Sequence, residues 1–427
     1  MTGFRQLARN HDFTVLWVGG TVSELGSRMS MFVFPLIAFA MTRSAFTAAL
    51  AETCHLVGLA VALLPAGVLA DRVDRRRLMR TASACGVLLY ASLVVAMVTG
   101  VLTITHLLVV ALLTGACAAL FGPAESSAVR SVVSTAELPT ALSQNQGRQH
   151  VASLVGGPLG GALYAVTRWL PFALDAVSYA VSWFTLGRLR NDLSAPVVVG
   201  PRARPRQEIA EGVRFIRHHP FLRVLTVWAA LTNLMVNALF FAALLRLIQA
   251  GFPPLQIGLV DTAAGAFGIL GALAAPAIID RFATGWLTVA IAWSFAPLVV
   301  PMVFFNNPAV VAAALGVGLF LNPAGNAGIG AYRMAITPPE LQGRTLATMQ
   351  FVAMSSMPLS PLLAGWLLGW YGGAVAIAVL GALTAAVALI PTLSASVRSV
   401  PRPEVWSAEP PLPVPAGGSA TRTRPRR

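Results

Sequence analysis

The sequence predicts an all-α polytopic membrane protein, with twelve transmembrane helices in two pseudo-symmetric six-helix bundles. The first observation is composition: 56% of the 427 residues are hydrophobic and 11% are charged, which is more apolar surface than a soluble domain can bury. The second is a set of twelve apolar segments, each long enough to cross a hydrocarbon core about 30 Å thick. The third is an internal repeat that divides these segments into two sets of six.

The twelve segments fall into two groups separated by one long polar loop. They cover approximately residues 13–41, 46–70, 78–99, 103–124, 139–167 and 170–189, and then 221–250, 255–279, 285–305, 308–334, 339–370 and 372–393. We therefore expect an N-terminal bundle (1–189), a cytoplasmic linker (190–220), a C-terminal bundle (221–395) and a disordered, basic, Pro-rich tail (396–427). In the linker, Ile209, Val213 and Ile216 have helical spacing, which predicts a short helix on the inner leaflet or a merely solvated one.

The same pattern of residues occurs once in each group of segments. Gly122-Pro123-Ala124 is followed by Arg130, Glu137 and Pro158, and Asn322-Pro323-Ala324 is followed by Arg333, Glu340 and Pro361. In both groups Arg and Glu are seven residues apart, and Glu and Pro are twenty-one residues apart. Membrane proteins with such repeats place a central site at the interface of their two halves.

The arginines give the chain an orientation. The net charge of +14 comes entirely from arginine, because the chain contains no lysine. Only Arg43 and Arg168 fall in loops on one side of the predicted helices, and Arg28 and Arg246 lie within helices. All other arginines fall on the opposite side. Because arginine beside a span stays in the cytoplasm, we expect a multi-pass protein of the inner (cytoplasmic) membrane with both termini cytoplasmic.

Several functional classes lack a signal in the sequence. No base-reading motif accompanies the positive charge, so lipid headgroups are better partners than nucleic acid. Cys54, Cys85 and Cys117 lie far apart along the chain in apolar segments, without metal-ligand spacing. No Walker A sequence and no convergent nucleophile and base are present, so we expect neither an ATP motor nor an enzyme. We also expect no metal and no other cofactor.

A dense cluster of charges separates the second and third predicted helices. Residues 65–80 read PAGVLADRVDRRRLMR. So many charged residues in so short a segment suit a tight turn held at the cytoplasmic face of the membrane. The pair Asp280-Arg281 repeats Asp71-Arg72 after the eighth segment. The residues that we assign to a cytoplasmic gate are Gly67, Asp71, Arg72, Arg75, Arg76, Asp280, Arg281 and Glu340.

Two helix starts are predicted within reach of this gate. Thr337-Pro338-Pro339-Glu340 and Ser134-Thr135-Ala136-Glu137 both fit a capping box. A helix start carries partial positive charge, so we expect Asp71 to contact the start of the eleventh helix and Asp280 that of the fifth. These contacts would hold the two halves together on the inside. The alternative is that the residues only cap and orient their helices.

Two motifs resemble those of a known family. Residues 67–76 have the pattern Gly-x-Leu-Ala-Asp-Arg-x-Asp-Arg-Arg, which resembles the signature between helices 2 and 3 of the major facilitator superfamily, with Asp74 where Gly is usual. In the fifth segment, Gly157-Pro158-Leu159-Gly160-Gly161-Ala162 resembles the Gly-Pro-x-x-Gly-Gly motif of exporters that exchange drug for proton, with Ala162 in place of the last Gly. The resemblance makes Gly157, Pro158 and Gly161 antiporter-motif candidates; close packing by small residues is the alternative.

The likeness covers nearly the whole chain. FALDAVSYAVSWF (172–184), GVRFIRHHPFLRVL (212–225) and LQGRTLATMQFV (341–352) resemble the macrolide-efflux and enterobactin-exporter branch. The fourth segment lacks the intramembrane Arg that many proton-coupled members carry. The resemblance implies alternating access and efflux of a small amphipathic compound, a drug or siderophore-like metabolite, by proton antiport. The alternatives are a lysophospholipid or endogenous-metabolite transporter, and a non-transporting membrane sensor on the same fold. We expect a monomer whose partners are a small molecule, protons and the lipid bilayer.

Ionisable residues within predicted helices are costly to bury and are therefore functional candidates. Glu24 lies about eleven residues into the first helix, near mid-membrane, and Arg28 follows one turn later, so the two can pair. The proton-coupling candidates are Glu24, Arg28, Asp261 and Glu52, with a permanent Glu24–Arg28 brace as the alternative. Glu125, near the inner end of the fourth helix, suits gating or transport. Asp175, expected near the outer interface, suits a structural role.

Five further residues are candidates for the wall of a substrate cavity: Asn233, Asn237, Phe34, Gln149 and Asn326. Amides within helices can contact a substrate, but hydrogen bonds between helices are the more frequent explanation. Phe34 suits an apolar wall, although most aromatic residues in spans face lipid or neighbouring helices.

Overall fold

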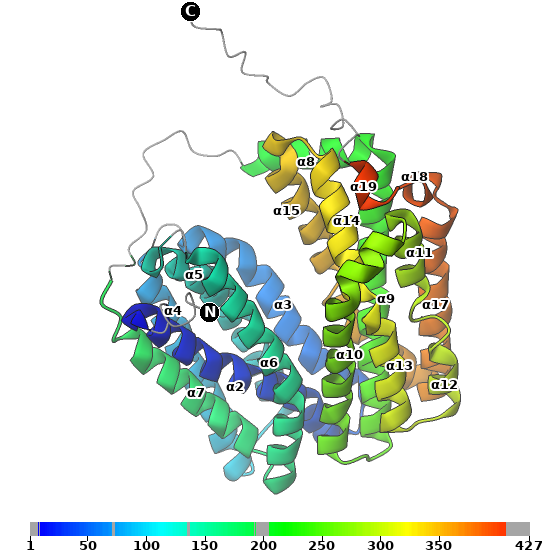
Figure 1. Ribbon diagram of the computed structural model, residues 1–427. Coiled ribbons are helices and arrows are strands. Elements are labelled where there is room, and N and C mark those ends of the chain that lie inside the picture. Colours follow the sequence, from blue (N-terminus) through cyan, green and yellow to red (C-terminus); the bar gives the residue numbers. More distant parts are fainter. Residues whose placement is uncertain are drawn as a thin grey trace, which may run out of the picture.

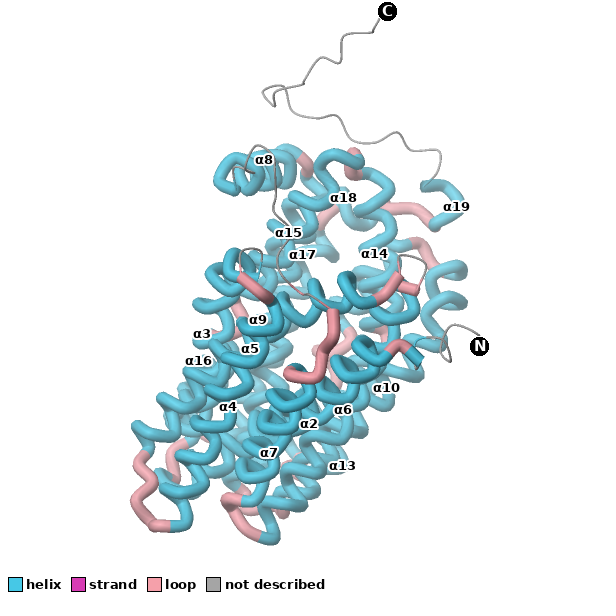
Figure 2. The backbone as a smooth tube through the Cα atoms, turned by 90° about the vertical axis from the view of Figure 1, so that its left-hand side faces the viewer, coloured by secondary structure: helices cyan, strands magenta, loops and turns pink. Residues whose placement is uncertain are grey.

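A computed structural model describes residues 7, 9–70, 73–134, 137–191, 193 and 205–406, and among these residues helices occur without any β-strand. The N-terminal half comprises α2 (His11–Thr42), α3 (Ala45–Ala70), α4 (Arg75–Val98), α5 (Ile104–Val132), α6 (Leu138–Val166) and α7 (Leu170–Leu186). After α8 (Pro205–His218), the C-terminal half comprises α9 (Pro220–Gln249), α10 (Pro254–Arg281), α11 (Thr284–Trp293), α12 (Val299–Phe304), α13 (Pro308–Phe320), α14 (Asn322–Ile336), α15 (Pro339–Ser355), α16 (Leu359–Tyr371) and α17 (Gly373–Leu393). Two short helices follow, α18 (Ala395–Arg398) and α19 (Pro403–Trp406). Figures 1 and 2 place α8, α18 and α19 together at one end of the bundle, called here the α8 end.

Nine helical segments of the described chain are long and apolar enough to cross a membrane. Helices α7 and α11 are shorter apolar helices, and α6 has 29 residues but a polar first half. Together these elements correspond to the twelve predicted segments. Helix α5 continues past its predicted end at residue 124 to Val132, because the polar residues after Pro123 end the apolar run but not the helix.

Three segments predicted as single helices in the C-terminal half are interrupted beside a proline. The breaks fall around Pro297 between α11 and α12, before Pro323 between α13 and α14, and at Pro358 between α15 and α16. A proline lacks the N–H group that continues the helical ladder, and its ring clashes with the preceding turn. In the N-terminal half, by contrast, four prolines lie inside continuous helices: Pro35, Pro65, Pro123 and Pro158.

The buried core joins the two halves at one end only. One cluster combines Phe34 and Tyr90 of the N-terminal half with Leu239 and Leu380 of the C-terminal half. Toward the α8 end, the core divides into a cluster from the N-terminal half alone and another from the C-terminal half alone. The halves are therefore packed together at the end opposite α8 and diverge toward the α8 end, as Figure 1 shows.

Helix α8 packs against α9 and α15 of the C-terminal half. Its buried face includes Gly212, Phe215 and Ile216, and Glu211 forms an ion pair with Arg344 of α15. Val213 is exposed, and the side chain of Ile209 lies outside what the structure describes. Protein rather than lipid covers the apolar face of α8.

One of the two predicted capping boxes does not form. The Thr337 hydroxyl donates to the Arg333 carbonyl at 2.7 Å, and α15 begins after Pro338 without a side-chain cap, because Thr337 still belongs to the end of the preceding helix. Before α6, the Glu137 carboxylate accepts from the Ser134 N–H at 3.3 Å and from its hydroxyl at 2.7 Å. Of the two predicted capping boxes, only the one before α6 therefore has the hydrogen bond from the serine to the glutamate side chain.

The C-terminal tail packs further than the sequence predicts. Val397 and Val400 are buried against the C-terminal half. The Trp406 Nε1–H group donates to the Pro401 carbonyl at 3.0 Å, and its ring lies 5.5 Å from the Tyr332 ring. The prediction of disorder from residue 396 is therefore wrong up to residue 406, because these apolar side chains pack on the surface of the C-terminal half. Residues 407–427 lie outside the described part.

Candidate functional site: a charged cavity between the two halves

A cavity of about 370 Å³ lies between the two halves, with walls from α2, α3, α6, α9, α10 and α13. We call it the central cavity. Its apolar wall includes Phe32, Phe240 and Phe241, and its ionisable residues are Arg28, Glu52, His150 and Asp261. The volume and the apolar wall are those of a small-molecule site, and the charges come from both halves.

Helix α6 meets α10 of the other half through paired small residues. Gly157 lies against Gly258, where an added Cβ atom would be 3.3 Å from the Gly258 carbonyl oxygen. Gly161 packs on Pro254 so closely that a Cβ atom would overlap the carbonyl group there. Pro158 lies between them inside α6. The predicted antiporter-motif residues therefore lie at the contact between the halves, where the absence of side chains lets two backbones approach.

The neighbouring glycines of α6 face its own half. Gly156 packs against Arg28 and Gly160 against Met29 of α2, and a Cβ atom on either glycine would crowd the α2 backbone. Two stripes of glycine, each with a spacing of four residues, thus run along different sides of α6. One stripe holds α6 against α2, and the other holds it against α10.

A second contact closes the other side of the central cavity. Gly365 of α16 packs against Ala45, Phe46 and Ala49 of α3, so small residues again allow two helices to approach closely. Both contacts belong to the end at which the core is continuous. The central cavity is therefore closed at the end opposite α8, and the halves diverge toward the α8 end.

Two acids in the central cavity lack a partner. The Arg28 Nε–H group donates to Glu24 Oε1 at 2.9 Å. Glu52 is only 8% exposed, and Asp261 lies beside Gly157, but neither has a hydrogen-bond or ion-pair partner within the described ranges. Unpaired acids away from water are costly, which marks both as places to bind a proton or a cation. No group of three or more His, Cys, Asp or Glu side chains in the described part can hold a metal ion.

The arginine pattern predicts Arg148 at the edge of the cytoplasmic loop before the fifth helix, but its side chain lies in the protein interior. It lies in the first half of α6 with its side chain 1% exposed, and it forms two hydrogen bonds with Glu125 of α5, at 2.8 and 3.0 Å. Gly20 of α2 lies directly against this pair, where any side chain would overlap it. The residues around Arg148 in the sequence are polar, so hydropathy gave no sign that it is buried. The one sequence feature that pointed to a buried partner was Glu125, an acid within the fourth helix that had no assigned role.

The predicted gate residues Arg75 and Arg76 hold the start of α4 against the end of α5 and the segment after α7. Arg75 donates to the Ser131 hydroxyl at 3.0 Å, and Arg76 donates to the Asn191 carbonyl at 2.6 Å. Gly67 has open space where a Cβ atom would be. Asp71 and Arg72 lie outside the described residues, and with them the contact expected between Asp71 and the eleventh helix.

The predicted gate residues of the C-terminal half do not contact the N-terminal half. Asp280, Arg281 and Glu340 are exposed, and within the described ranges neither acid forms an ion pair. The expected contact of Asp280 with the start of the fifth helix is therefore absent in this conformation. The reason is that the halves diverge at this end.

Phe34 belongs to the core and not to the cavity wall. It is 1% exposed, and its ring centroid lies 5.1 Å from that of Phe172 and 6.3 Å from that of Tyr90. Phe32, two residues earlier, points to the central cavity instead, because two residues turn a helix by about 200°. Asp175, expected near the outer interface, is fully buried in this same half and accepts a hydrogen bond from Ser178 at 2.9 Å.

The predicted amides are also outside the central cavity. Asn233 and Asn326 line a separate cavity of about 320 Å³ inside the C-terminal half. Asn237 donates to the Asn233 carbonyl at 2.7 Å. Gln149 is exposed and does not line the central cavity, whereas its neighbour His150 does. The placement of Phe34, Gln149 and these three amides at that cavity is therefore corrected.

Comparison with known proteins identifies a family for this architecture. Residues 16–321 match the family described as Major Facilitator Superfamily. Multidrug efflux pump Tap of Mycolicibacterium fortuitum is 27% identical over 369 residues, which cover 80% of this chain and 85% of that protein. The solved structure of the nucleoside transporter NupG matches with a TM-score of 0.71 at 9% identity, over 89% of this chain and 98% of that one. A bacterial homologue of the human lysosomal transporter Spinster, inward-facing and unoccupied, matches with a TM-score of 0.70 at 13% identity, over 92% and 98%.

Gly161→Val is expected to open the contact between α6 and α10, because even a Cβ atom overlaps the Pro254 carbonyl. Overpacking of this kind costs about 1–3 kcal/mol, a shift of about fivefold or more in a conformational equilibrium. The readout is labelling of Ser153→Cys, in the central cavity, by an impermeant maleimide added to intact spheroplasts of a strain whose protein lacks the native cysteines. Labelling should rise with Gly161→Val and stay unchanged with Gly268→Val, a position on α10 with open space; equal labelling of the two would contradict this account of the contact.

Arg148→Met is expected to leave the Glu125 carboxylate buried without a partner, which costs about 3–5 kcal/mol. The midpoint of thermal unfolding of the purified protein should fall. Adding Glu125→Gln to the same chain should recover most of the loss, because the unpaired charge is then gone. Arg130→Met, which changes an exposed arginine on the neighbouring helix, is the matched control; an equal loss in both single variants would show that the pair has no special role.

Proposed function

The chain belongs to the major facilitator superfamily, and from this premise we propose that it is a secondary active efflux transporter. Its substrate is a small amphipathic compound, a drug or a siderophore-like metabolite, and it works by alternating access. Members of this family are multi-pass membrane transporters of small molecules and not enzymes. The relative named above as a multidrug efflux pump supports export of such a compound, and the unpaired acids of the central cavity support proton antiport.

The observation that carries the proposal is the central cavity itself. It holds apolar rings and charged side chains from both halves. It is closed at one end by uncharged small residues of α6, α10, α3 and α16, while the halves diverge at the other end. Such a cavity takes up a compound from one side only. Rocking of the halves about the cavity would break the small-residue contacts and expose the same walls to the other side.

We propose that Asp261 and Glu52 carry the proton. Each faces the central cavity without a partner in the described chain, whereas Glu24 is held by Arg28. Substrate and proton would then compete for the same acids, and this competition couples their movements. One charge that crosses 100 mV supplies about 2.3 kcal/mol, equivalent to a concentration ratio of about fifty.

The gate residues are proposed to act in the other conformation. When the halves meet at the α8 end, Asp71 and Arg72 approach the start of α15, and Asp280 approaches the start of α6. A carboxylate there meets the partial positive charge of a helix start. The same charged surface at the α8 end includes the other predicted gate residues, Gly67, Arg75, Arg76, Arg281 and Glu340. The small-residue contacts at the opposite end have no such cluster of charges.

The second candidate functions are a transporter of lysophospholipid or of an endogenous metabolite, and a membrane sensor that transports nothing. A panel of drug susceptibilities with and without expression, followed by uptake into proteoliposomes, separates them. Efflux driven by an imposed proton gradient supports the proposal. Substrate binding without any movement across the bilayer would favour the sensor.

Asp261→Asn is expected to abolish uphill efflux while substrate binding and downhill exchange remain, because the amide cannot carry a proton. Efflux driven by an imposed proton gradient, measured per molecule in proteoliposomes, should fall at least tenfold, about 1.4 kcal/mol in the driven step. Glu404→Gln, which changes an exposed acid of α19 outside the central cavity, serves as the control. Full pumping by Asp261→Asn would remove this residue from the mechanism and move attention to Glu52.

The α8 end is proposed to face the cytoplasm, with both termini inside the cell and the chain in the inner membrane. Cysteines placed at positions 74 and 205 are then expected to resist an impermeant thiol reagent added to intact spheroplasts, and to react once the membrane is permeabilised. Position 168, between α6 and α7, should react in both preparations. Labelling of positions 74 and 205 in intact spheroplasts would reverse the orientation.

A further inference from the structure

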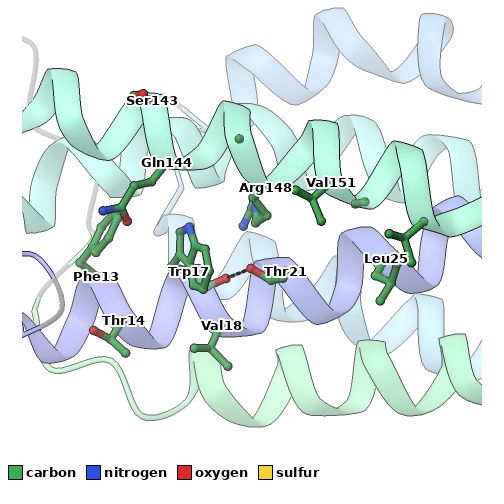
Figure 3. A pocket seen from close by; sticks show the side chains of 13 residues that line it. Phe13, Thr14, Trp17, Val18, Thr21, Leu25, Ser143, Gln144, Arg148 and Val151 are labelled. Carbon is green, nitrogen blue, oxygen red and sulfur yellow. Dashed lines mark hydrogen bonds between the residues drawn. The ribbon is translucent and has the colours of Figure 1, made fainter. Parts of the chain in front are cut away.

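A second and larger cavity, of about 690 Å³, runs between α2 and the first half of α6. We call it the α2–α6 groove. Its walls are Phe13, Trp17 and several aliphatic side chains, among them Val18, Leu25 and Val151, and Figure 3 shows these side chains facing one another across the two helices. The volume lies in the range of small-molecule pockets. No residue is shared with the lining of the central cavity.

The α2–α6 groove is electrically neutral. Arg148 is the one charged residue among those that line it, and the Glu125 carboxylate binds both terminal nitrogens of its guanidinium group. The pair is almost completely buried. A charged ligand therefore finds no free countercharge here, whereas the central cavity holds the unpaired acids Glu52 and Asp261.

Several hydrogen-bonding groups in the groove have no partner in the described chain, two of them on Trp17 and Gln144. The Trp17 Nε1–H donor is shielded from solvent and has no partner, and the side-chain amide of Gln144 has none in the described chain. By contrast, the Thr21 hydroxyl is satisfied by the Trp17 carbonyl at 2.6 Å. A buried donor without a partner costs about 1–3 kcal/mol, so an acceptor brought in beside the indole ring regains that energy.

The groove leads toward the central cavity along one stripe of α2. Thr14, Val18, Thr21 and Leu25 line the groove, and Arg28, Phe32 and Pro35 continue the same spacing of three and four residues into the central cavity. Residues at this spacing lie on one face of a helix. The groove and the central cavity therefore follow one another along the same face of α2.

We propose that the α2–α6 groove is a binding site for an uncharged amphiphile, with one aromatic ring system and one hydrogen-bond acceptor, that waits there before it enters the central cavity. The ring packs against Trp17 and the valines, and the acceptor receives the Trp17 N–H. The inference rests on the proposed efflux function for its role in transport, but the binding site itself can be tested without any transport.

The test measures binding of a neutral fluorescent ketone, 6-propionyl-2-dimethylaminonaphthalene, to the full chain in nanodiscs, after subtraction of the signal from empty nanodiscs. Val151→Trp fills the groove at a position that is 61% exposed, so the protein should fold and the affinity should fall at least tenfold. Val166→Trp, on the same helix outside the groove and 71% exposed, should leave the affinity unchanged. Equal affinity of the Val151→Trp and native proteins overturns the site.

A second variant tests the acceptor. Trp17→Phe keeps a ring and removes the N–H, so affinity for the ketone should fall about three- to tenfold, the value of one hydrogen bond, while competition by 2-ethylnaphthalene, which has no acceptor, stays the same. An unchanged affinity for the ketone overturns the role of Trp17. Asp261→Asn should bind the ketone normally even when efflux is lost, which separates a failure of the groove from a failure of the proposed function. Loss of ketone binding in Asp261→Asn would place the probe in the central cavity and overturn the proposal.

Discussion

The close approach of α6 and α10 is the constraint on which the rest of the structure depends. Lipid surrounds both halves and is as apolar as they are, so exclusion of water does not drive the halves together inside the bilayer. Contact must come from packing and from hydrogen bonds between helices, and the Thr262 hydroxyl of α10 donates to the Leu154 carbonyl of α6 at 2.5 Å. Packing at backbone distance requires residues without side chains. Gly157 and Gly161 meet Gly258 and Pro254 at that distance. Because the same helix also lies at backbone distance from α2, α6 sets the position of the N-terminal half relative to α10, and with it the width of the central cavity.

The charges of the molecule are arranged according to what each end must do. The contacts that close the end opposite α8 are made mainly by glycine and alanine, with Asp261 as an ionisable neighbour, whereas the surfaces at the α8 end carry Arg75, Arg76, Asp280 and Glu340. Inside the N-terminal half, the Glu125–Arg148 pair is joined by two hydrogen bonds and lies where Gly20 leaves room for it, while Arg148 Nε has no partner in the described chain. Such a pair braces helices, because removing either partner leaves a buried charge. The two unpaired acids of the central cavity, Glu52 and Asp261, lie where the two halves meet.

The sequence is sufficient to predict where the helices lie along the chain. It is not sufficient to predict which side chains of each helix point to the core and which point to a cavity. Hydropathy places most spans to within a few residues, although α5 ends at Val132 and not at residue 124. The antiporter-motif glycines lie where α6 meets α10. The direction of a side chain depends on packing, and a shift of two residues exchanges Phe34 in the core for Phe32 in the cavity. The meeting of Glu52 and Asp261 could not be read from their positions, since they are far apart along the chain and come from different halves. Arg148 was missed for the opposite reason: its sequence neighbours are polar, and only its distance to Glu125 reveals that it is buried.

A proton can change the balance between two conformations only if it binds them with different affinity. The glycine and proline residues in the contact between α6 and α10 have nothing to titrate themselves. Asp261, however, lies one helical turn from Gly258 on α10, and Gly157 lies against that same turn while also lining the central cavity. The acid that takes the proton and the glycines that close the cavity thus share one turn of one helix. A change in charge or hydration at Asp261 therefore acts next to the point where the two backbones touch. This proximity gives a proton in the cavity a short physical path by which to alter the contact between the halves.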